Sequence, residues 1–377
     1  MKLAPLDMHV HLVGNGRGGS GCWLRLGATW WHRPLVAYML RHVGLRRVSL
    51  RAQDFDERYV AHLVRLVRTS SLGGLVLLAQ DEVYTESGEK LPDRGTFYVP
   101  NDYLFQVCQQ YGEFLPAVSI HPARPDAMDE LERCLELGAV MLKLLPNCHN
   151  VDCNNPRYRP FWERMAEAGL PLLAHTGGEH TVDVLEPAYS DPRYLTGPLE
   201  IGVTVIAAHS ATRSGLRDPE YFEIFAEMLE AYPNLYGDTS AWNVPMRGRY
   251  ANRCVGPEAG LLGERLLHGS DFPVPCSGLW AALRRYAPWR EYRKWQKQPN
   301  VLERDYRLKL AMGFTEEHFT RAWSLLRQPL PNIEFDEGQY CAECNRTGAA
   351  LIGNRLLCLD CYTARASCCV EFDGDDE

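Results

Sequence analysis

The chain has 377 residues, of which 46% are hydrophobic and 23% are charged, and its net charge is −8. This composition is that of an ordinary globular protein, and it excludes a disordered chain or a fibrous repeat. The negative net charge disfavours nucleic acid as a partner. The longest dense apolar run, at 72–79, is far shorter than the ~20 residues of a membrane-spanning helix, so we expect no membrane partner.

The N-terminal segment and the cysteines bear on the compartment. The first residues contain no apolar stretch of the length that a secretory signal needs. The 13 cysteines are an odd number, and most of them are scattered along the chain. Scattered thiols are typical of a reducing compartment and not of a disulfide scaffold. We therefore expect a cytoplasmic protein.

Short apolar runs alternate with segments of helical periodicity along most of the chain. Runs rich in Val, Ile and Leu predict buried parallel strands at 3–10, 74–78, 114–120, 139–145, 170–174, 203–208, 234–236 and 265–267. Helical spacing of apolar residues is clearest at 54–68, 126–137, 159–168 and 220–231. Eight strands that alternate with helices predict an α/β protein with a (β/α)8 TIM barrel, and an open doubly wound sheet is the alternative.

Two segments interrupt this alternation. Residues 12–49 predict a long insertion after the first strand, and 81–99 form a second polar loop. Such insertions lie at the C-terminal face of a barrel, where substrate loops are found. Helical segments at 278–298, 301–311 and 315–327 follow the last strand. The expected organisation is a barrel at 1–328, a linker at 329–337, a small module at 338–370 and an acidic tail at 371–377.

Polar residues stand at the ends of several predicted strands. His9 and His11 are two residues apart, so on a strand both imidazoles point to the same side and can reach one cation such as Zn²⁺. Lys143, His175, His209 and Asp271 follow later apolar runs at spacings of 32, 34 and 62 residues. A barrel has ~31 residues per βα unit, so these residues fall at equivalent strand ends. One such residue alone is ordinarily a packing or capping residue. The whole set, however, predicts a metal site at one end of the barrel, where the strand ends converge.

These motifs resemble those of the amidohydrolase superfamily of metal-dependent (β/α)8-barrel enzymes. The resemblance covers roughly residues 1–325. It rests on Asp7-Met8-His9-Val10-His11, Leu142-Lys143-Leu144, Leu173-Ala174-His175-Thr176-Gly177, Ala208-His209-Ser210, Tyr236-Gly237-Asp238-Thr239-Ser240 and His268-Gly269-Ser270-Asp271-Phe272-Pro273. The last two motifs are similar to the amidohydrolase 2 branch, which includes aminocarboxymuconate-semialdehyde decarboxylase and related hydrolases.

The resemblance implies a catalytic metal, Zn²⁺ or another divalent ion, that is held by His9, His11, His175 and Asp271. It implies that His209 is a second-metal ligand or activates the bound water. Lys143 would be carboxylated and bridge two metals, or it would stay a cation that holds an anionic substrate group. One or two catalytic metals are therefore expected. In this chemistry Asp271 accepts and redelivers a proton, and His209 can stabilise a developing oxyanion.

The expected reaction is hydrolysis of an amide, lactone or ester of a small molecule. A non-oxidative decarboxylase of a small carboxylic acid is one alternative, and an inactive barrel that acts as a zinc-ribbon binding protein is another. Three further residues near predicted strand ends are candidates for substrate binding, namely Asp81, His121 and His180.

Two Cys-x-x-Cys units lie near the end of the chain. Cys341, Cys344, Cys358 and Cys361 predict a four-cysteine structural zinc site of the zinc-ribbon kind, with an iron–sulfur centre as a minor alternative. The residues between the two units predict a hairpin around a turn at 353–354. A module of roughly 35 residues buries too little apolar area to fold without metal. It could cap the barrel, join copies in a homo-oligomer or bind a protein partner, and its mixed charges disfavour nucleic acid.

Overall fold

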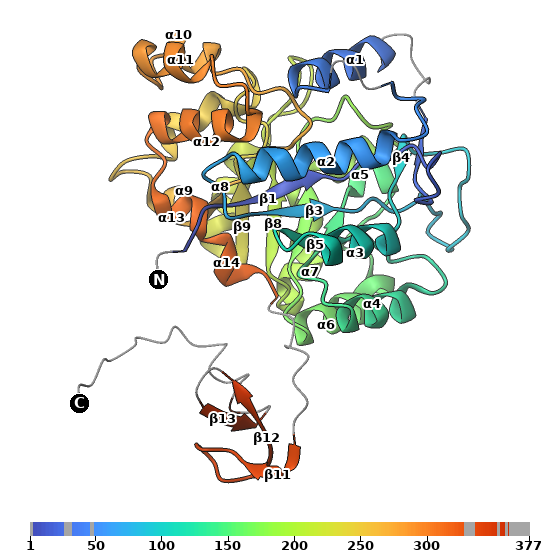
Figure 1. The fold of residues 1–377 in the computed structure, drawn as a ribbon. Coiled ribbons are helices and arrows are strands. Elements are labelled where there is room, and N and C mark those ends of the chain that lie inside the picture. The colour runs from blue at the N-terminus through green and yellow to red at the C-terminus, as the bar shows by residue number, and fades with distance from the viewer. Residues whose placement is uncertain are drawn as a thin grey trace, which may run out of the picture. The chain divides into compact units, whose positions relative to one another are not determined.

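The computed structural model describes residues 3–25, 32–45, 49–327, 336–352, 355–358 and 361 (Figure 1). The chain divides into two compact units, residues 1–327 and 328–377, and each is described by itself. The expected linker up to residue 335, the turn at 353–354 and the tail at 371–377 lie outside the described residues. No helix in the described ranges is both long enough and apolar enough to cross a membrane.

Eight parallel strands form the first unit's sheet, in the order β1-β3-β5-β6-β7-β8-β9-β10. Backbone hydrogen bonds join β1 to the segment directly after β10, from Met8 to His268 (3.1 Å) and from His11 to Phe272 (2.9 Å). The prediction of a TIM barrel is thereby confirmed. The strands are β1 (Leu6–His11), β3 (Gly74–Leu78), β5 (Phe114–Val118), β6 (Met141–Leu144), β7 (Leu172–His175), β8 (Val205–Ala208), β9 (Leu235–Asp238) and β10 (Leu266–Leu267).

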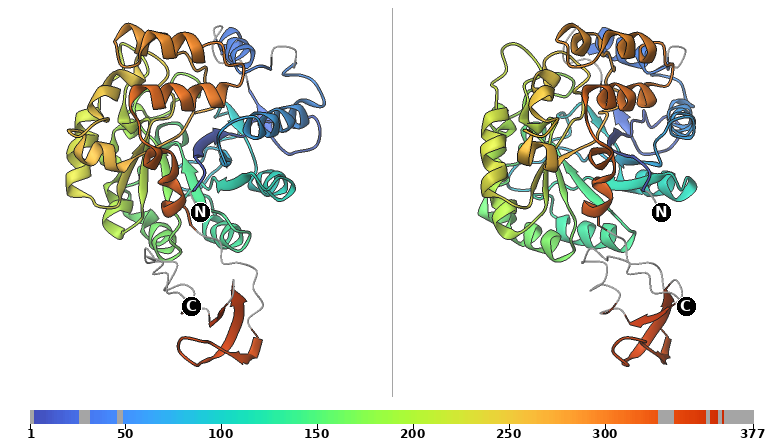
Figure 2. Two further views of the ribbon diagram at one scale, coloured as in Figure 1. Left: turned by 60° about the vertical axis from the view of Figure 1, so that its left-hand side comes forward. Right: turned by 90° about the vertical axis from the view of Figure 1, so that its left-hand side faces the viewer.

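Helices follow most of the strands and surround the barrel (Figure 2). Those between the strands are α2 (Phe55–Arg68), α3 (Asn101–Gln110), α4 (Ala127–Glu136), α5 (Pro146–His149), α6 (Arg159–Glu167), α7 (Thr196–Ile201), α8 (Phe222–Ala231) and α9 (Gly260–Arg265). After β10 come α10 (Leu279–Leu283), α11 (Trp289–Trp295), α12 (Val301–Met312), α13 (Glu316–Thr320) and α14 (Ala322–Leu325). The four helices expected from periodicity all form, each within two residues of the expected ends.

Every predicted strand is present, but several begin later than expected. Leu170 and Val203 are buried although they precede β7 and β8. An apolar run in the sequence therefore overestimates the length of a strand, because residues just before the strand can be buried as well. In β1 the register with β3 shifts between Asp7 and Val10. This bulge lets Met8 join the apolar interior of the barrel while His9 and His11 also face the site.

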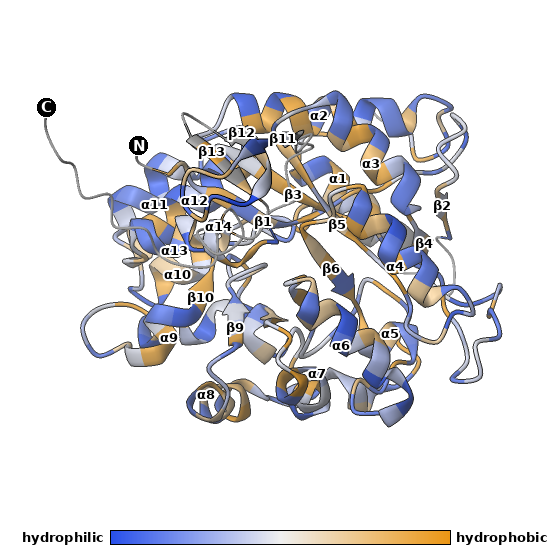
Figure 3. Cartoon of the chain, turned by 90° about the horizontal axis from the view of Figure 1, so that it is seen from below, coloured by the Kyte–Doolittle hydropathy of each residue, from blue (hydrophilic) through white to orange (hydrophobic). Residues whose placement is uncertain are grey.

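The apolar core has two layers. One cluster fills the barrel, and its members from the strands include Leu6, Met8, Val76, Leu78, Ala117, Met141, Leu173, Ile206, Ala208 and Leu267. The larger cluster lies between the strands and the helices. Both layers are apolar because a parallel strand in a barrel is covered on both faces, and Figure 3 shows β3 and β5 in the colour of apolar residues. This framework holds the strand ends in place.

Two insertions meet beside the C-terminal strand ends. The insertion after β1 contains β2 (Trp23–Leu24) and α1 (His32–His42). The loop after β3 contains β4 (Phe97–Tyr98), which pairs antiparallel with β2. The second polar loop is thus tied to the first insertion, a pairing that periodicity could not predict because it joins segments more than 70 residues apart.

The second unit is a small antiparallel sheet. It consists of β11 (Asp336–Tyr340), β12 (Thr347–Ile352) and β13 (Arg355–Cys358). Ile352 lies opposite Arg355, as expected for a hairpin. The first strand begins at Asp336, inside the range expected to be linker. The sulfur atoms of Cys341, Cys344, Cys358 and Cys361 all lie within 4.8 Å of one another, which is the arrangement of a four-cysteine metal site.

Candidate active site

Three potential metal ligands gather where β1 meets the segment after β10. The Nε2 atoms of His9 and His11 lie 3.3 and 3.2 Å from Oδ1 of Asp271. The ligand atoms of these three residues lie within 4.8 Å of one another. The closure of the barrel explains this contact, because the backbone N–H of Asp271 donates to the carbonyl of His9 at 2.9 Å.

Two more histidines complete the rim from neighbouring strands. His175 ends β7 and His209 directly follows β8, and their ring centroids lie 4.9 Å apart. The ring of His209 lies 5.4 Å from that of His9. The Nε2 atom of His175 is buried and has no hydrogen-bond partner among the described residues. The carboxylate of Glu179 lies beyond hydrogen-bond distance, with Oε2 at 3.6 Å, so this nitrogen can bind a ligand.

Lys143 lies at the floor of the same site. Its side chain comes from β6 and is buried, and Nζ lies 3.4 Å from Nε2 of His9. Burial lowers the pKa of Lys143 to about 8, because desolvation disfavours the ammonium form. The structure therefore brings together all six residues that the sequence analysis assigned to the metal centre.

The protonation states suit metal binding. Burial lowers the pKa of His9 to about 4 and that of His175 to about 3, so both imidazoles are neutral at pH 7. Burial also lowers the pKa of His209 well below its usual value. Burial raises the pKa of Asp271, but neighbouring His209 and a hydrogen bond from His11 outweigh it and keep the carboxyl group ionised. Neutral imidazoles and a carboxylate are the forms that coordinate divalent ions.

Asp238 at the end of β9 orients the two histidines beside it. Its Oδ2 accepts the Nδ1 proton of His9 at 2.7 Å, and its Oδ1 accepts the backbone N–H of His209 at 2.7 Å. With the proton on Nδ1, the Nε2 lone pair of His9 faces the cluster. Carboxylate partners of this kind fix the tautomer of metal-binding histidines. Asp238 belongs to the motif at 236–240, but the sequence alone assigned it no role.

His209 is held in a defined tautomer as well. Its Nδ1 lies 3.2 Å from the carbonyl oxygen of Ser240, which can only accept a proton, and 2.7 Å from the hydroxyl of the same residue. The Ser240 hydroxyl in turn donates to Asp238. His209 therefore carries its proton on Nδ1 and presents an unprotonated Nε2 to the site. In this form the ring accepts a hydrogen bond and does not donate one to an oxyanion.

The residues present fit a divalent ion. Two imidazole nitrogens and one carboxylate oxygen form the cluster, and the free Nε2 of His175 lies on the adjacent rim. Within the part of the chain that the structure describes, this is the one such group in the barrel.

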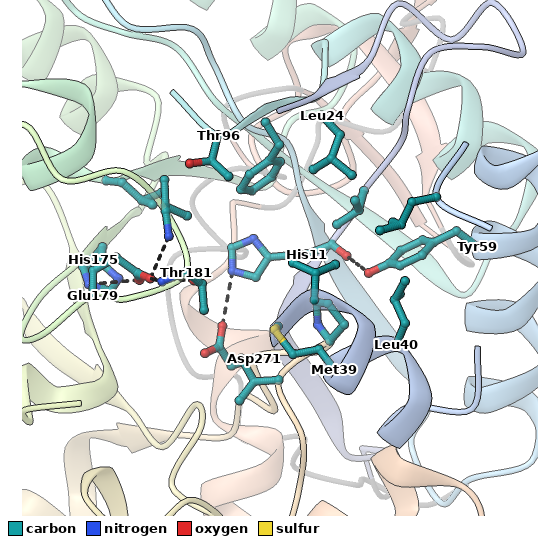
Figure 4. A pocket seen from close by; sticks show the side chains of 18 of the residues that line it. His11, Leu24, Met39, Leu40, Tyr59, Thr96, His175, Glu179, Thr181 and Asp271 are labelled. Atoms are coloured by element: carbon teal, nitrogen blue, oxygen red, sulfur yellow. Dashed lines mark hydrogen bonds and ion pairs between the residues drawn. The ribbon is translucent and has the colours of Figure 1, made fainter. Parts of the chain in front are cut away.

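A cavity opens over these residues. Its empty volume is about 870 Å³, with open solvent at its mouth included, and it is lined by the side chains of His11, Lys143, His175, His209 and Asp271 together with a wall from the insertions. Figure 4 shows His175 and Glu179 on one side of the site, Leu24 and Leu40 on the other, and His11 and Asp271 between them. A concave site of this kind, with a few polar groups at its base and apolar walls, is typical of small-molecule sites.

Glu179 is a residue whose position the sequence analysis did not predict. Its side chain is buried beside His175, with Oε2 at 3.6 Å from Nε2 of that ring. Its Oε1 accepts backbone N–H groups of His180, Thr181 and Val182. The pair Gly177-Gly178, with Gly177 at a φ of 74°, marks a turn in the loop after β7, but the sequence does not show that this turn brings Glu179 to the site.

The three candidate substrate residues lie elsewhere. Asp81 accepts the backbone N–H of His121 at 2.6 Å and pairs with Arg124, and the His121 ring contacts the carbonyl of His149. His180 is exposed and pairs with Asp218 at 3.0 Å. None of Asp81, His121 and His180 is among the described residues that line the cavity. Their contacts organise loops, so proximity to a strand end did not bring them to the site.

The cysteine site has its own electrostatic signature. A hydrogen bond from Arg346 lowers the pKa of the Cys344 thiol, and hydrogen bonds to the backbone N–H groups of Cys344 and Cys358 outweigh burial and lower that of Cys341 to about 6. Thiolates are the form in which cysteine binds zinc.

Comparisons with known proteins address the fold and the family. A TIM-barrel protein of uncharacterised function from Bordetella bronchiseptica is 19% identical, with a TM-score of 0.50 over 82% of this chain and 99% of that one. A protein from Pseudomonas putida that is provisionally named a 2-pyrone-4,6-dicarboxylic acid hydrolase is 19% identical (TM-score 0.44; 72% and 84% covered). The 5-carboxyvanillate decarboxylase of Sphingomonas paucimobilis is 12% identical (TM-score 0.46; 85% and 99% covered).

A search among curated proteins found no match. The profile of the amidohydrolase family matches residues 6–291, which include every barrel strand and all the residues of the metal cluster. The chain belongs to the amidohydrolase family.

Proposed function

We propose that the chain is a metal-dependent hydrolase that cleaves an amide, lactone or ester bond of a small molecule. The observation that carries this proposal is the cluster of His9, His11 and Asp271 at the floor of a cavity, with the free Nε2 of His175 beside it. A decarboxylase would share the metal site. We favour hydrolysis because the ionised carboxylate of Asp271, beside the ion, can accept a proton from the attacking water.

A divalent ion, Zn²⁺ by the nature of the ligands, would be held by His9, His11, His175 and Asp271, where it would polarise a carbonyl group and lower the pKa of water. Water adds its oxygen to the carbonyl carbon and gives one proton to the Asp271 carboxylate. The carbon–oxygen or carbon–nitrogen bond to the leaving group then breaks, and Asp271 returns the proton to that group. The unprotonated Nε2 of His209 accepts a hydrogen bond from the water and orients it.

In this mechanism Lys143 is the cationic hydrogen-bond donor. Its ammonium group lines the cavity, so it can stabilise negative charge on the carbonyl oxygen in the transition state. His209 was expected to do so, but its tautomer makes it an acceptor. We propose one catalytic metal beside an unmodified Lys143 in the barrel, and a second ion in the four-cysteine site.

The test is a screen of the zinc-loaded protein against esters, lactones, amides and aromatic carboxylic acids, with metal content measured per chain. We expect hydrolysis of a neutral carbonyl substrate, two metals per chain and loss of turnover in Asp271→Asn. Release of carbon dioxide from an aromatic acid without any hydrolysis would assign the protein to the decarboxylases. Three metals per chain would contradict the single-ion centre.

A further inference from the structure

The charged and apolar groups of the cavity are separated. All of its ionisable side chains other than the Tyr59 phenol surround the metal cluster, and they are His11, Lys143, His175, Glu179, His209 and Asp271. The rest of the lining is almost wholly apolar, and its apolar members are Val13, Leu24, Val36, Met39, Leu40, Leu50, Phe55, Phe97, Leu145, Val182, Pro273 and Val274. We call this second set the apolar wall.

Half of the apolar wall, six of its twelve residues, comes from the insertions at 12–49 and 81–99. Val36, Met39 and Leu40 come from α1, and Leu24 and Phe97 come from the paired strands β2 and β4. Met39 and Leu40 are 8% and 7% exposed, so they present little surface except to the cavity. Figure 4 shows Leu24, Met39 and Leu40 around the side of the site away from His175. The part of a substrate that does not react would lie against these side chains.

The few polar groups near the wall already have partners. The hydroxyl of Tyr59 donates to the carbonyl of His11 at 2.8 Å, and that of Thr181 donates to Glu179 at 2.5 Å. The hydroxyl oxygen of Thr96 accepts the backbone N–H of Asp183 at 2.9 Å. Of these three hydroxyl groups, only that of Thr96 has a proton left to donate to a carboxylate against the wall.

Cations are equally scarce. Among the described residues that line the cavity, Lys143 is the one lysine or arginine. The nearby buried guanidinium of Arg247 donates to the carbonyl oxygens of Thr212 (3.1 Å) and Gly178 (2.6 Å). Lys143 itself lies at the metal cluster, within 3.4 Å of His9. A second anionic group on a substrate would thus meet no counter-charge among the described residues at the wall, and burial of an unpaired charge is strongly unfavourable.

We propose that the substrate is an uncharged ester, lactone or amide whose acyl portion is aliphatic or aromatic, and that dicarboxylate-type substrates are rejected. This inference rests on the proposed hydrolase function and narrows it. The reaction consumes one water and yields a carboxylic acid together with an alcohol or amine. The acid forms at the metal cluster and ionises there or on release.

Two matched esters test the selectivity. In para-nitrophenyl hexanoate the acyl chain ends in a methyl group, and in mono-para-nitrophenyl adipate a carboxylate replaces that methyl. We expect kcat/KM of the zinc-loaded protein to be ~100-fold higher for the hexanoate, because the adipate carboxylate is desolvated without a partner. A preference for the adipate ester would overturn the inference while leaving the hydrolase function intact.

Binding provides a readout that does not depend on turnover. Hexanamide and the monoamide of adipic acid differ in the same way as the esters, and isothermal titration measures their affinities. We expect hexanamide to bind ~100-fold more tightly. If neither ester is hydrolysed but hexanamide binds preferentially, the hydrolase proposal fails and the cavity selectivity stands. Equal or tighter binding of the charged amide would refute the selectivity.

A variant of the wall sharpens the test. Met39→Lys introduces a cation on a flexible stem, and Met39→Leu is the matched control of similar volume. We expect Met39→Lys to reduce the preference for the hexanoate ester by at least ~10-fold and Met39→Leu to retain it. Circular dichroism checks folding, and if Met39→Lys does not fold, the wild-type comparison of the two esters and two amides decides alone.

Discussion

The two metal-ligand clusters of this chain are built in opposite ways. The barrel cluster joins His9 to Asp271, which are 262 positions apart, and it stands on a large apolar core in two layers. The four cysteines span 20 positions, and in that unit the buried hydrophobic cluster consists of Cys341, Ala349 and Cys358. The barrel therefore has the packing to hold its candidate ligands without an ion, whereas we expect the small sheet to depend on one. The size of the apolar core around each candidate site therefore separates an expected catalytic metal from an expected structural one.

The largest effect that we expect comes from the rim of the barrel. His175→Ala removes a neutral imidazole whose Nε2 is free for a ligand, so we expect catalytic metal to be lost and kcat/KM to fall by ~1,000-fold or more. The metal of the cysteine site stays in place, and metal analysis would find one ion per chain. His180→Ala is the control, because that exposed histidine lies five residues away and off the cavity. Full turnover by a His175→Ala protein without barrel metal contradicts the proposed role.

The second prediction concerns the cysteine site. Cys344→Ser removes one of four thiolate ligands, so we expect loss of one metal and unfolding of β11, β12 and β13. Activity of the barrel should change by less than ~2-fold, since its core is independent. Hydrogen exchange of the strand amides measures the unfolding. Cys108→Ser, at a half-buried thiol of the barrel unit, is the matched control. Protection of the three strands in the metal-free protein would show that the unit folds without its ion.

A smaller effect is expected from the carboxylate behind the ligands. Asp238→Asn preserves shape, but an amide accepts the Nδ1 proton of His9 less strongly and so orients the ring less well. We expect metal affinity or kcat/KM to fall by ~10–100-fold, the usual cost of losing such a partner. Competition with a chelator measures the affinity. An unchanged affinity would mean that packing alone orients His9.

The smallest effect concerns pH. Burial lowers the pKa of Lys143 to about 8, so the ammonium form predominates below that pH and is lost above it. If Lys143 acts as a cation, kcat/KM falls as the pH rises through about 8. Lys143→Arg keeps the charge to higher pH, so this decline should disappear. A rate that instead rises through the same range would indicate that the neutral amine is needed, as carboxylation of the lysine requires.

Much of the architecture could be predicted from sequence because it depends on local patterns. Apolar runs and helical periodicity identified all eight barrel strands and the main helices, and the recurrence of polar strand ends identified the six residues that meet at the site. The cysteine cluster could also be predicted from a local pattern, because its four ligands lie in two Cys-x-x-Cys units that are close together along the chain.

Other features required the tertiary structure. The tautomers of His9 and His209 depend on Asp238 and Ser240, whose positions are set by neighbouring strands. Glu179 reaches the site because the loop after β7 turns there. Loop conformation also keeps the three candidate substrate residues off the cavity, namely Asp81, His121 and His180. The apolar wall arises only when β2 pairs with β4 and α1 packs nearby. Sequence by itself determined which residues stand at strand ends, because periodicity is a property of the chain. The tertiary structure decided which side chains face one another, because that depends on contacts between segments that no local pattern connects.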